Sequence, residues 1–101
     1  MIVLTTWPTD RDAAPFARAL VDERLAACVS VLAPMASTYR WEGAITEAHE
    51  HQVVIKTTAA AEPALRARLA ALHPYDVPEY LVLPVQAGGE EYLAWIRGVV
   101  G

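Results

Sequence analysis

Three residue types are scarce or missing in this chain of 101 residues. It contains one cysteine, Cys28, one lysine, Lys56, and no asparagine. A single cysteine cannot form an internal disulfide or the Cys-x-x-Cys pair of a copper-delivery protein, and a lone thiol favours a reducing, cytoplasmic location. A small acylphosphatase-type enzyme positions its water with an asparagine, so the absence of this residue argues against that activity. We expect a protein that is not an enzyme.

Positive charge and long apolar runs are also in short supply. Eight Lys and Arg residues stand against twelve Asp and Glu residues, which gives a formal net charge of −4. The chain therefore lacks the excess of cations that tracks a phosphate backbone, and we expect no nucleic-acid partner. Charged residues interrupt every apolar run before it reaches the roughly 18 residues of a membrane span, so we expect no membrane insertion.

The length fits one domain over residues 1–101. A chain of this size buries only about two-thirds of its unfolded surface, and no disulfide compensates for the small core. We therefore expect additional stability from self-association.

The hydrophobic pattern of the first half predicts a strand, a helix and a hairpin. Residues 1–7 are apolar at nearly every position, as in a central strand. Asp10 or Asp12 can cap a following helix that tolerates Pro15 in its first turn and ends near Arg24. A period-two pattern runs from Cys28 to Trp41 and returns over residues 45–58. The Glu42-Gly43 dipeptide between them supplies a turn, so this region is predicted to be a long antiparallel hairpin.

The second half predicts a helix, a short strand and a last helix. Pro63 fits the first turn of a helix that stops at His73-Pro74. Residues 80–85 form a short apolar strand, and Pro84 within it fits an edge or strand-end position because it has no amide hydrogen. A helix follows the Gly88-Gly89 pair. The resulting fold is α+β, a ferredoxin-like βαββαβ arrangement with an extra C-terminal helix.

The predicted hairpin is too long for the predicted helices to cover. Arms of about 14 residues extend roughly 45 Å, whereas a helix of about 13 residues covers roughly 20 Å. The distal half carries Met35, Tyr39, Trp41 and Ile45, an apolar surface that is seldom left in water. We expect a neighbouring subunit to cover it; the alternative is a hairpin that bends back onto its own sheet.

The three histidines have different contexts. His49 and His51 lie on one face of a strand with Glu47, so they could hold zinc or copper, although solvated side chains near a hairpin tip follow the same pattern. His73 ends a helix, where it could cap the helix C-terminus or bind a ligand.

The lone cysteine and the lone lysine also allow two interpretations each. Cys28 could be a nucleophile or a small core residue, and its apolar neighbours favour the core residue because burial raises a thiol pKa. Lys56 stands within an apolar strand, where it could face solvent or hold an anionic ligand or a carboxylate such as Glu79. The aromatic residues Trp7, Tyr39, Trp41 and Tyr75 are expected to be core or interface anchors rather than a platform on which a ligand stacks.

The stretches ERLAACVSVL, STYRWEG, VVIKTT, ALHPYDVPEYLVLPV and YLAWI cover nearly the whole chain. In content, order and spacing they resemble the CutA divalent-cation tolerance proteins. The resemblance implies a ferredoxin-like subunit in a compact homotrimer with the long hairpins packed between subunits. It also implies an architecture similar to the trimeric PII signalling proteins, an association with tolerance of copper and other divalent cations, no obligatory cofactor and no catalytic residues.

The resemblance further places the family's shared polar and aromatic residues in a crevice between subunits. Here these residues are Cys28, Trp41, Lys56, His73, Tyr75 and Glu79. A thiolate and an imidazole suit copper, so Cys28 and His73 are the expected metal ligands, and the other four are the expected ligand-binding residues. Thr5 stands where some relatives have a cysteine, so one subunit cannot supply two sulfur ligands.

Two functions remain open from the sequence. The first is a trimeric binding or sensor module for a metal ion or a small anion at the crevice. The second is a PII-like structural trimer that serves as a scaffold or anchor for another protein.

Overall fold

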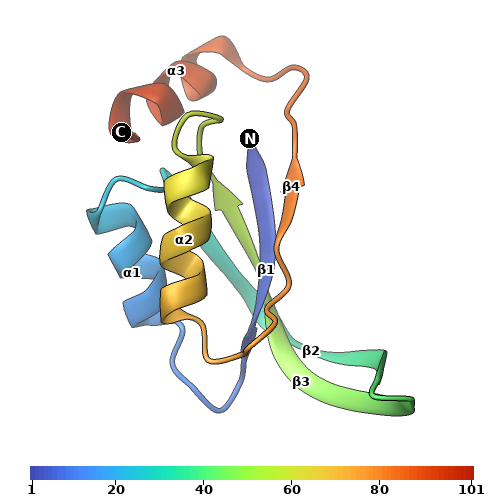
Figure 1. The fold of residues 1–101 in the computed structure, drawn as a ribbon. Helices are drawn as coiled ribbons and strands as arrows, with labels where there is room; N and C mark the ends of the chain where they lie inside the picture. The colour runs from blue at the N-terminus through green and yellow to red at the C-terminus, as the bar shows by residue number, and fades with distance from the viewer.

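The structure is a computed structural model that describes residues 1–101 throughout (Figure 1). The elements follow in the order β1 (Ile2–Pro8), α1 (Ala14–Asp22), β2 (Cys28–Trp41), β3 (Ala44–Lys56), α2 (Glu62–Leu72), β4 (Leu81–Leu83) and α3 (Glu90–Val99). The predicted βαββαβ order and the extra C-terminal helix are confirmed.

The four strands form one antiparallel sheet in the order β2-β3-β1-β4, which is the ferredoxin-like order. The first strand lies in the middle, where Ile2 faces Lys56 of β3 on one side and Leu83 of β4 on the other. Strand β4 lies at the edge of the sheet and ends just before Pro84, in agreement with the edge or strand-end position predicted for this proline. The strand is shorter than the predicted range 80–85 because Pro84 has no amide hydrogen to extend the ladder.

The hydrophobic core lies between the sheet and the two helices α1 and α2, which cover one face of the sheet (Figure 1). The largest fully buried apolar side chains are Val3, Leu20, Val53, Ile55, Leu65 and Leu69. Leu65 and Leu69 are one helical turn apart, so they lie on the same face of α2. At the end of this helical layer, α3 is tied to the loop after α1 through a hydrogen bond from the Gly101 amide to the Arg24 carbonyl (2.9 Å).

The β2–β3 hairpin extends well beyond the helices and bends away from the rest of the sheet (Figure 1). A register shift between Val31 and Pro34 interrupts the ladder at the bend, and the His51 ring contacts the Leu32 carbonyl there (2.6 Å). Beyond the bend, Trp41 is 52% exposed and Ile45 is 65% exposed. The bend therefore does not fold the distal half back onto its own sheet, and the predicted apolar surface stays uncovered within one chain.

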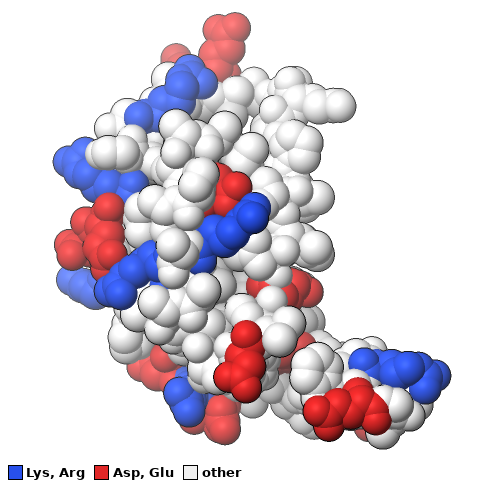
Figure 2. Space-filling view, viewed as in Figure 1, with Lys and Arg blue, Asp and Glu red and all other residues white.

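Charged side chains are unevenly distributed over the surface. In Figure 2 they gather over the helices and at the hairpin tip, whereas the surface over β4 shows none. None of the three helices combines the length and the apolar character that crossing a lipid bilayer requires.

Candidate ligand-binding groove

A groove of about 690 Å³ lies between the β2–β3 hairpin and the segment Pro74–Glu79, which leads from α2 toward β4. Three other surface depressions are smaller, at about 420 to 450 Å³. The aromatic and ionisable residues of the groove are Tyr39, Trp41, Glu50, Tyr75, Asp76 and Glu79. The groove is the largest of these four sites, and it contains three of the four predicted ligand-binding residues, Trp41, Tyr75 and Glu79.

The groove forms because strand β3 extends beyond β1 and helix α2 ends near the same end of β1. Strand β3 continues past β1, whose last pair is Pro8 with Glu50, and carries the hairpin outward. Helix α2 ends at His73, whose backbone is extended (ψ 136°), because the following Pro74 disfavours a helical residue before it. The segment Pro74–Glu79 therefore turns back across the open side of the hairpin.

Three carboxylates line the groove without a basic residue. Glu50 is only 8% exposed and accepts a hydrogen bond from the Tyr75 hydroxyl (3.4 Å). Glu79 accepts a hydrogen bond from Nε2 of Gln52 (2.8 Å). The third carboxylate belongs to Asp76. Burial and the neighbouring charge of Glu50 raise the pKa of Tyr75 above its usual value of 10.0, so this phenol stays protonated and donates at neutral pH.

His73 lies directly behind the groove and is buried against Trp7 and Phe16. Its Nε2 contacts the Thr6 carbonyl oxygen (2.6 Å), and its Nδ1 accepts a hydrogen bond from the Tyr75 amide (3.1 Å). This pattern requires the neutral tautomer with the proton on Nε2. Burial lowers the pKa of His73 below 6.5, although the Thr6 contact and the charge of Glu50 oppose the shift. Both ring nitrogens are therefore occupied by the protein itself.

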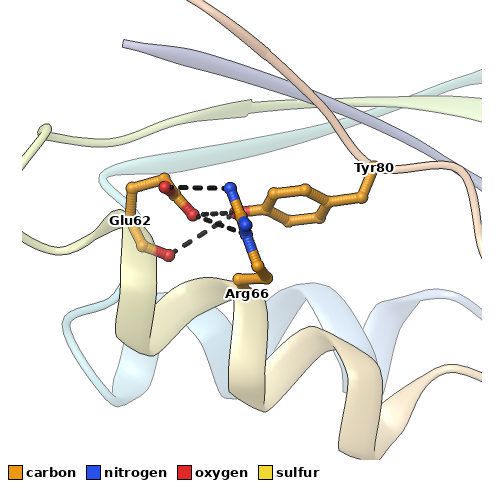
Figure 3. Close-up of polar contacts among 3 residues, drawn as sticks. All are labelled: Glu62, Arg66 and Tyr80. Carbon is orange, nitrogen blue, oxygen red and sulfur yellow. Dashed lines mark hydrogen bonds and ion pairs between the residues drawn. The ribbon is translucent and has the colours of Figure 1, made fainter.

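The segment after Pro74 is anchored at its far end by Tyr80 (Figure 3). The Tyr80 hydroxyl donates to Oε2 of Glu62 on α2 (2.9 Å), and Arg66 pairs with the same carboxylate through two nitrogens (3.1 and 3.2 Å). The Arg66 guanidinium also lies 5.1 Å from the centre of the Tyr80 ring. Burial and the Glu62 hydrogen bond raise the pKa of Tyr80 to about 12. The groove wall is thus held at both ends, by His73 and by Tyr80.

Cys28 and Lys56 lie elsewhere on the sheet. They face each other across β2 and β3, with Lys56 Nζ 3.9 Å from Cys28 Sγ. Lys56 pairs with Ile2, four residues before Thr6, so the lysine is about 13 Å along the strands from the position that His73 contacts. Glu79, which the sequence suggested as a partner for Lys56, is instead bound by Gln52.

The metal site expected from the sequence is not assembled within one chain. No group of three or more His, Cys, Asp and Glu side chains comes close enough to hold a metal ion. Cys28 belongs to the end of the sheet described above, and the nitrogens of His73 are occupied. At the hairpin, Nδ1 of His51 is bound to the Leu32 carbonyl. The residues of one chain therefore do not fit a resident metal.

The structure brings together three of the six predicted site residues. Trp41, Tyr75 and Glu79 line the groove, His73 supports it from behind, and Cys28 and Lys56 lie outside it. Sequence reasoning missed Tyr39, Glu50, Gln52 and Asp76 as groove residues. The available signal was the even numbering that Glu50 and Gln52 share with Lys56 on β3, which places them on one face of the strand.

Comparison with known proteins agrees with this fold over almost every residue. The family model described as CutA1 divalent ion tolerance protein matches residues 1–99. The divalent-cation tolerance protein CutA of Thermus thermophilus is 47% identical over 100 residues, which cover 99% of this chain and 97% of that protein. The solved structure of the Cut A1 protein from the same organism superposes with a TM-score of 0.94 at 47% identity, over 99% of this chain and 97% of that one.

The fold is also PII-like. The PII-like protein CutA from Nostoc sp. PCC 7120, solved in its apo form, superposes with a TM-score of 0.91 at 32% identity, over 99% of this chain and 96% of that chain. The names of these relatives describe tolerance of divalent cations and a PII-like fold, and they name no reaction. Because sequence and fold match over nearly the whole length, the chain belongs to the CutA1 family of divalent ion tolerance proteins.

Proposed function

We propose that this protein is a self-associating binding module of the divalent-cation response, and that its ligand is a cation held in the groove between the hairpin and Pro74–Glu79. The observation that carries the proposal is the charge of the groove. Glu50, Asp76 and Glu79 line it, and no lysine or arginine does. Clustered carboxylates attract cations and repel anions. A cation is therefore favoured over the small anion that the sequence also allowed, since that anion depended on Lys56.

The proposed assembly is a homotrimer in the cytoplasm, as the family resemblance implies. Support comes from the hairpin, where Tyr39, Trp41 and Ile45 are more than 40% exposed in one chain. Apolar surface of this kind is usually covered by a partner. The free thiol of Cys28 supports a reducing compartment. In the trimer, a neighbouring subunit would complete the groove, because Trp41 belongs both to the exposed hairpin and to the groove wall.

A more specific version of the proposal is that the cation is copper and that Cys28 and His73 bind it. Within one chain these residues lie at different ends of the sheet, so a shared ion would need ligands from two chains. His73 would also have to release the Thr6 carbonyl or the Tyr75 amide before it could bind an ion. Any metal is therefore a bound or sensed ligand in this proposal, and none is required for folding.

The alternative function is that of a scaffold or anchor for another protein. It is favoured by exposed aromatic surface outside the groove: Tyr92 and Trp95 on α3 lie 5.5 Å apart between ring centres and are 47% and 45% exposed. Aromatic side chains of this kind are enriched at protein interfaces. In a scaffold, the groove residues would serve only to stabilise the assembly.

Calorimetric titration of the assembled protein tests the choice between the two functions. We expect a cation, either a divalent metal ion or a small organic cation, to bind with an affinity that falls as NaCl is added, and ATP not to bind. Glu79→Gln should weaken binding, whereas Glu90→Gln at the start of α3 should leave it unchanged. Failure of every cation to bind would contradict the proposal and favour the scaffold.

A further inference from the structure

Within one chain, Glu50 is a largely buried carboxylate without a counter-charge. Its side chain forms no ion pair, and its only hydrogen bond is the 3.4 Å contact from the Tyr75 hydroxyl to Oε2. Yet the residue is only 8% exposed. A charged group removed from water without a positive partner is costly to a fold, so such groups are normally paired or bound to a ligand.

The unpaired oxygen of Glu50 faces the groove. No fully buried side-chain nitrogen or oxygen in the protein lacks a hydrogen-bond partner. Oε1 of Glu50 has no partner, so this atom is not fully buried, and the groove is the opening that Glu50 lines. Within one chain, the groove is therefore where a positive charge can reach Glu50.

Aromatic rings form the other walls of the same groove. Tyr39, Trp41 and Tyr75 all line it, and Tyr75 is held in place by the hydrogen bond from its backbone amide to Nδ1 of His73. The faces of such rings attract organic cations, and the flat guanidinium group both stacks on them and pairs with a carboxylate through two hydrogen bonds. A bare metal ion would gain little from aromatic walls and would need several ligands at once, which the chain does not bring together.

We propose that the groove binds an alkylguanidinium cation, with Glu50 as its counter-charge and the aromatic side chains against its flat faces. This inference rests on the proposed function, because it names the chemical class of the cation. The groove volume of about 690 Å³ lies within the range of small-molecule sites and far exceeds the space that one ion occupies. Asp76 and Glu79 exclude ligands that carry a carboxylate of their own.

The experiment is calorimetric titration of the assembled full chain with agmatine, with arginine and with ZnCl₂. Agmatine and arginine share the guanidinium group, but arginine adds a carboxylate. We expect agmatine to bind and arginine to bind at least about tenfold more weakly, because the acidic groove repels that carboxylate. Glu50→Gln, which keeps the side-chain shape, should weaken agmatine binding by about tenfold or more. Glu47→Gln, an exposed position on the same strand but outside the groove, is the matched control and should have no effect.

Sedimentation of each variant separates loss of ligand binding from loss of assembly. If Glu50→Gln disrupts the assembly, Asp76→Asn on the exposed side of the same groove takes its place, with an expected weakening of about threefold. Binding of ZnCl₂ without binding of agmatine would overturn the guanidinium inference and leave the cation function standing. Agmatine binding that neither variant weakens would place the site elsewhere and overturn the inference. If no cation binds, both the inference and the proposed function fail.

Discussion

His73 and Thr6 join two distant parts of the chain at the back of the groove. The imidazole Nε2 of His73, at the end of α2, donates to the backbone carbonyl oxygen of Thr6 in β1 across 2.6 Å. Because Nδ1 accepts from the Tyr75 amide, the ring can make both contacts only while it is neutral. Protonation of His73 at Nδ1 therefore removes the hydrogen bond that holds the Tyr75 backbone in the groove wall.

The first prediction is that the free energy of unfolding falls as the pH drops below about 6.5. Burial lowers the pKa of His73 in the folded protein. The unfolded chain then binds this proton more readily than the folded chain, so protonation favours unfolding. The contribution is fully present above the unfolded pKa and is lost as the pH falls toward the lowered pKa of the folded state. Urea unfolding at about pH 7.5 and pH 5.5, at one protein concentration, measures it.

His73→Gln provides the comparison for this prediction. Glutamine cannot be protonated, so the variant should be less stable at neutral pH but should lose less stability on acidification. If the pH dependence is the same in both proteins, the titrating group is not His73.

The second prediction concerns the anchor at the other end of the groove wall. Tyr80→Phe removes the hydroxyl that donates to Glu62 and should lower the free energy of unfolding by about 1 kcal/mol. Tyr92→Phe on α3 is the control, because its hydroxyl makes no hydrogen bond within the chain and its ring is 47% exposed. Ultraviolet titration should also show that Tyr80→Phe removes a phenol with a pKa of about 12. Equal stability of the two variants would contradict the anchoring role.

The third prediction tests the assembly. Sedimentation equilibrium at low micromolar concentration should give a mass of roughly three times 11.0 kDa. Trp41→Glu should dissociate the assembly or unfold the protein, because an unpaired carboxylate would replace an aromatic anchor at an apolar interface. Ala70→Glu on the exposed side of α2 is the matched control. A monomer in the unmutated protein would refute the trimer and the completed groove together.

The fourth prediction separates two possible copper sites. Copper held by Cys28 and His73 requires two chains, so its binding should disappear when Trp41→Glu disperses the assembly without unfolding it. The double variant His49→Ala/His51→Ala should keep this binding. Equilibrium dialysis with Cu²⁺ measures both, and the affinity should fall as the pH drops through the lowered pKa of His73, because a protonated imidazole cannot bind a metal. The reverse result, with binding lost only in the double variant, would move the ion to the hairpin.

The elements themselves followed from local patterns in the sequence. The Glu42-Gly43 turn has positive φ at both residues, 49° and 80°, which suits a tight hairpin turn and is easily adopted by glycine. Leu65 and Leu69 follow the helical period that buries one face of α2. These features depend on residues close together in the chain, so the sequence alone was sufficient to predict them.

The composition of the groove could not be predicted in the same way. The sequence placed Lys56 with Glu79 as possible partners, but the sheet register sets Lys56 opposite Cys28 and leaves Glu79 to Gln52. Glu50 was not recognised as a site residue at all. Its contact with Tyr75 joins residues 25 positions apart and depends on the bend of the hairpin and on the path after Pro74.

Periodicity and motifs along the chain were therefore enough to establish the order of strands and helices, the length of the hairpin and the family. Which side chains meet depended on the three-dimensional fold. A strand pattern defines the face of a residue, but distances of about 3.3 Å per residue separate positions that share that face. On β3, this spacing is the physical reason that Glu50 lies in an acidic groove while Lys56, six residues later on the same face, lies beside Cys28.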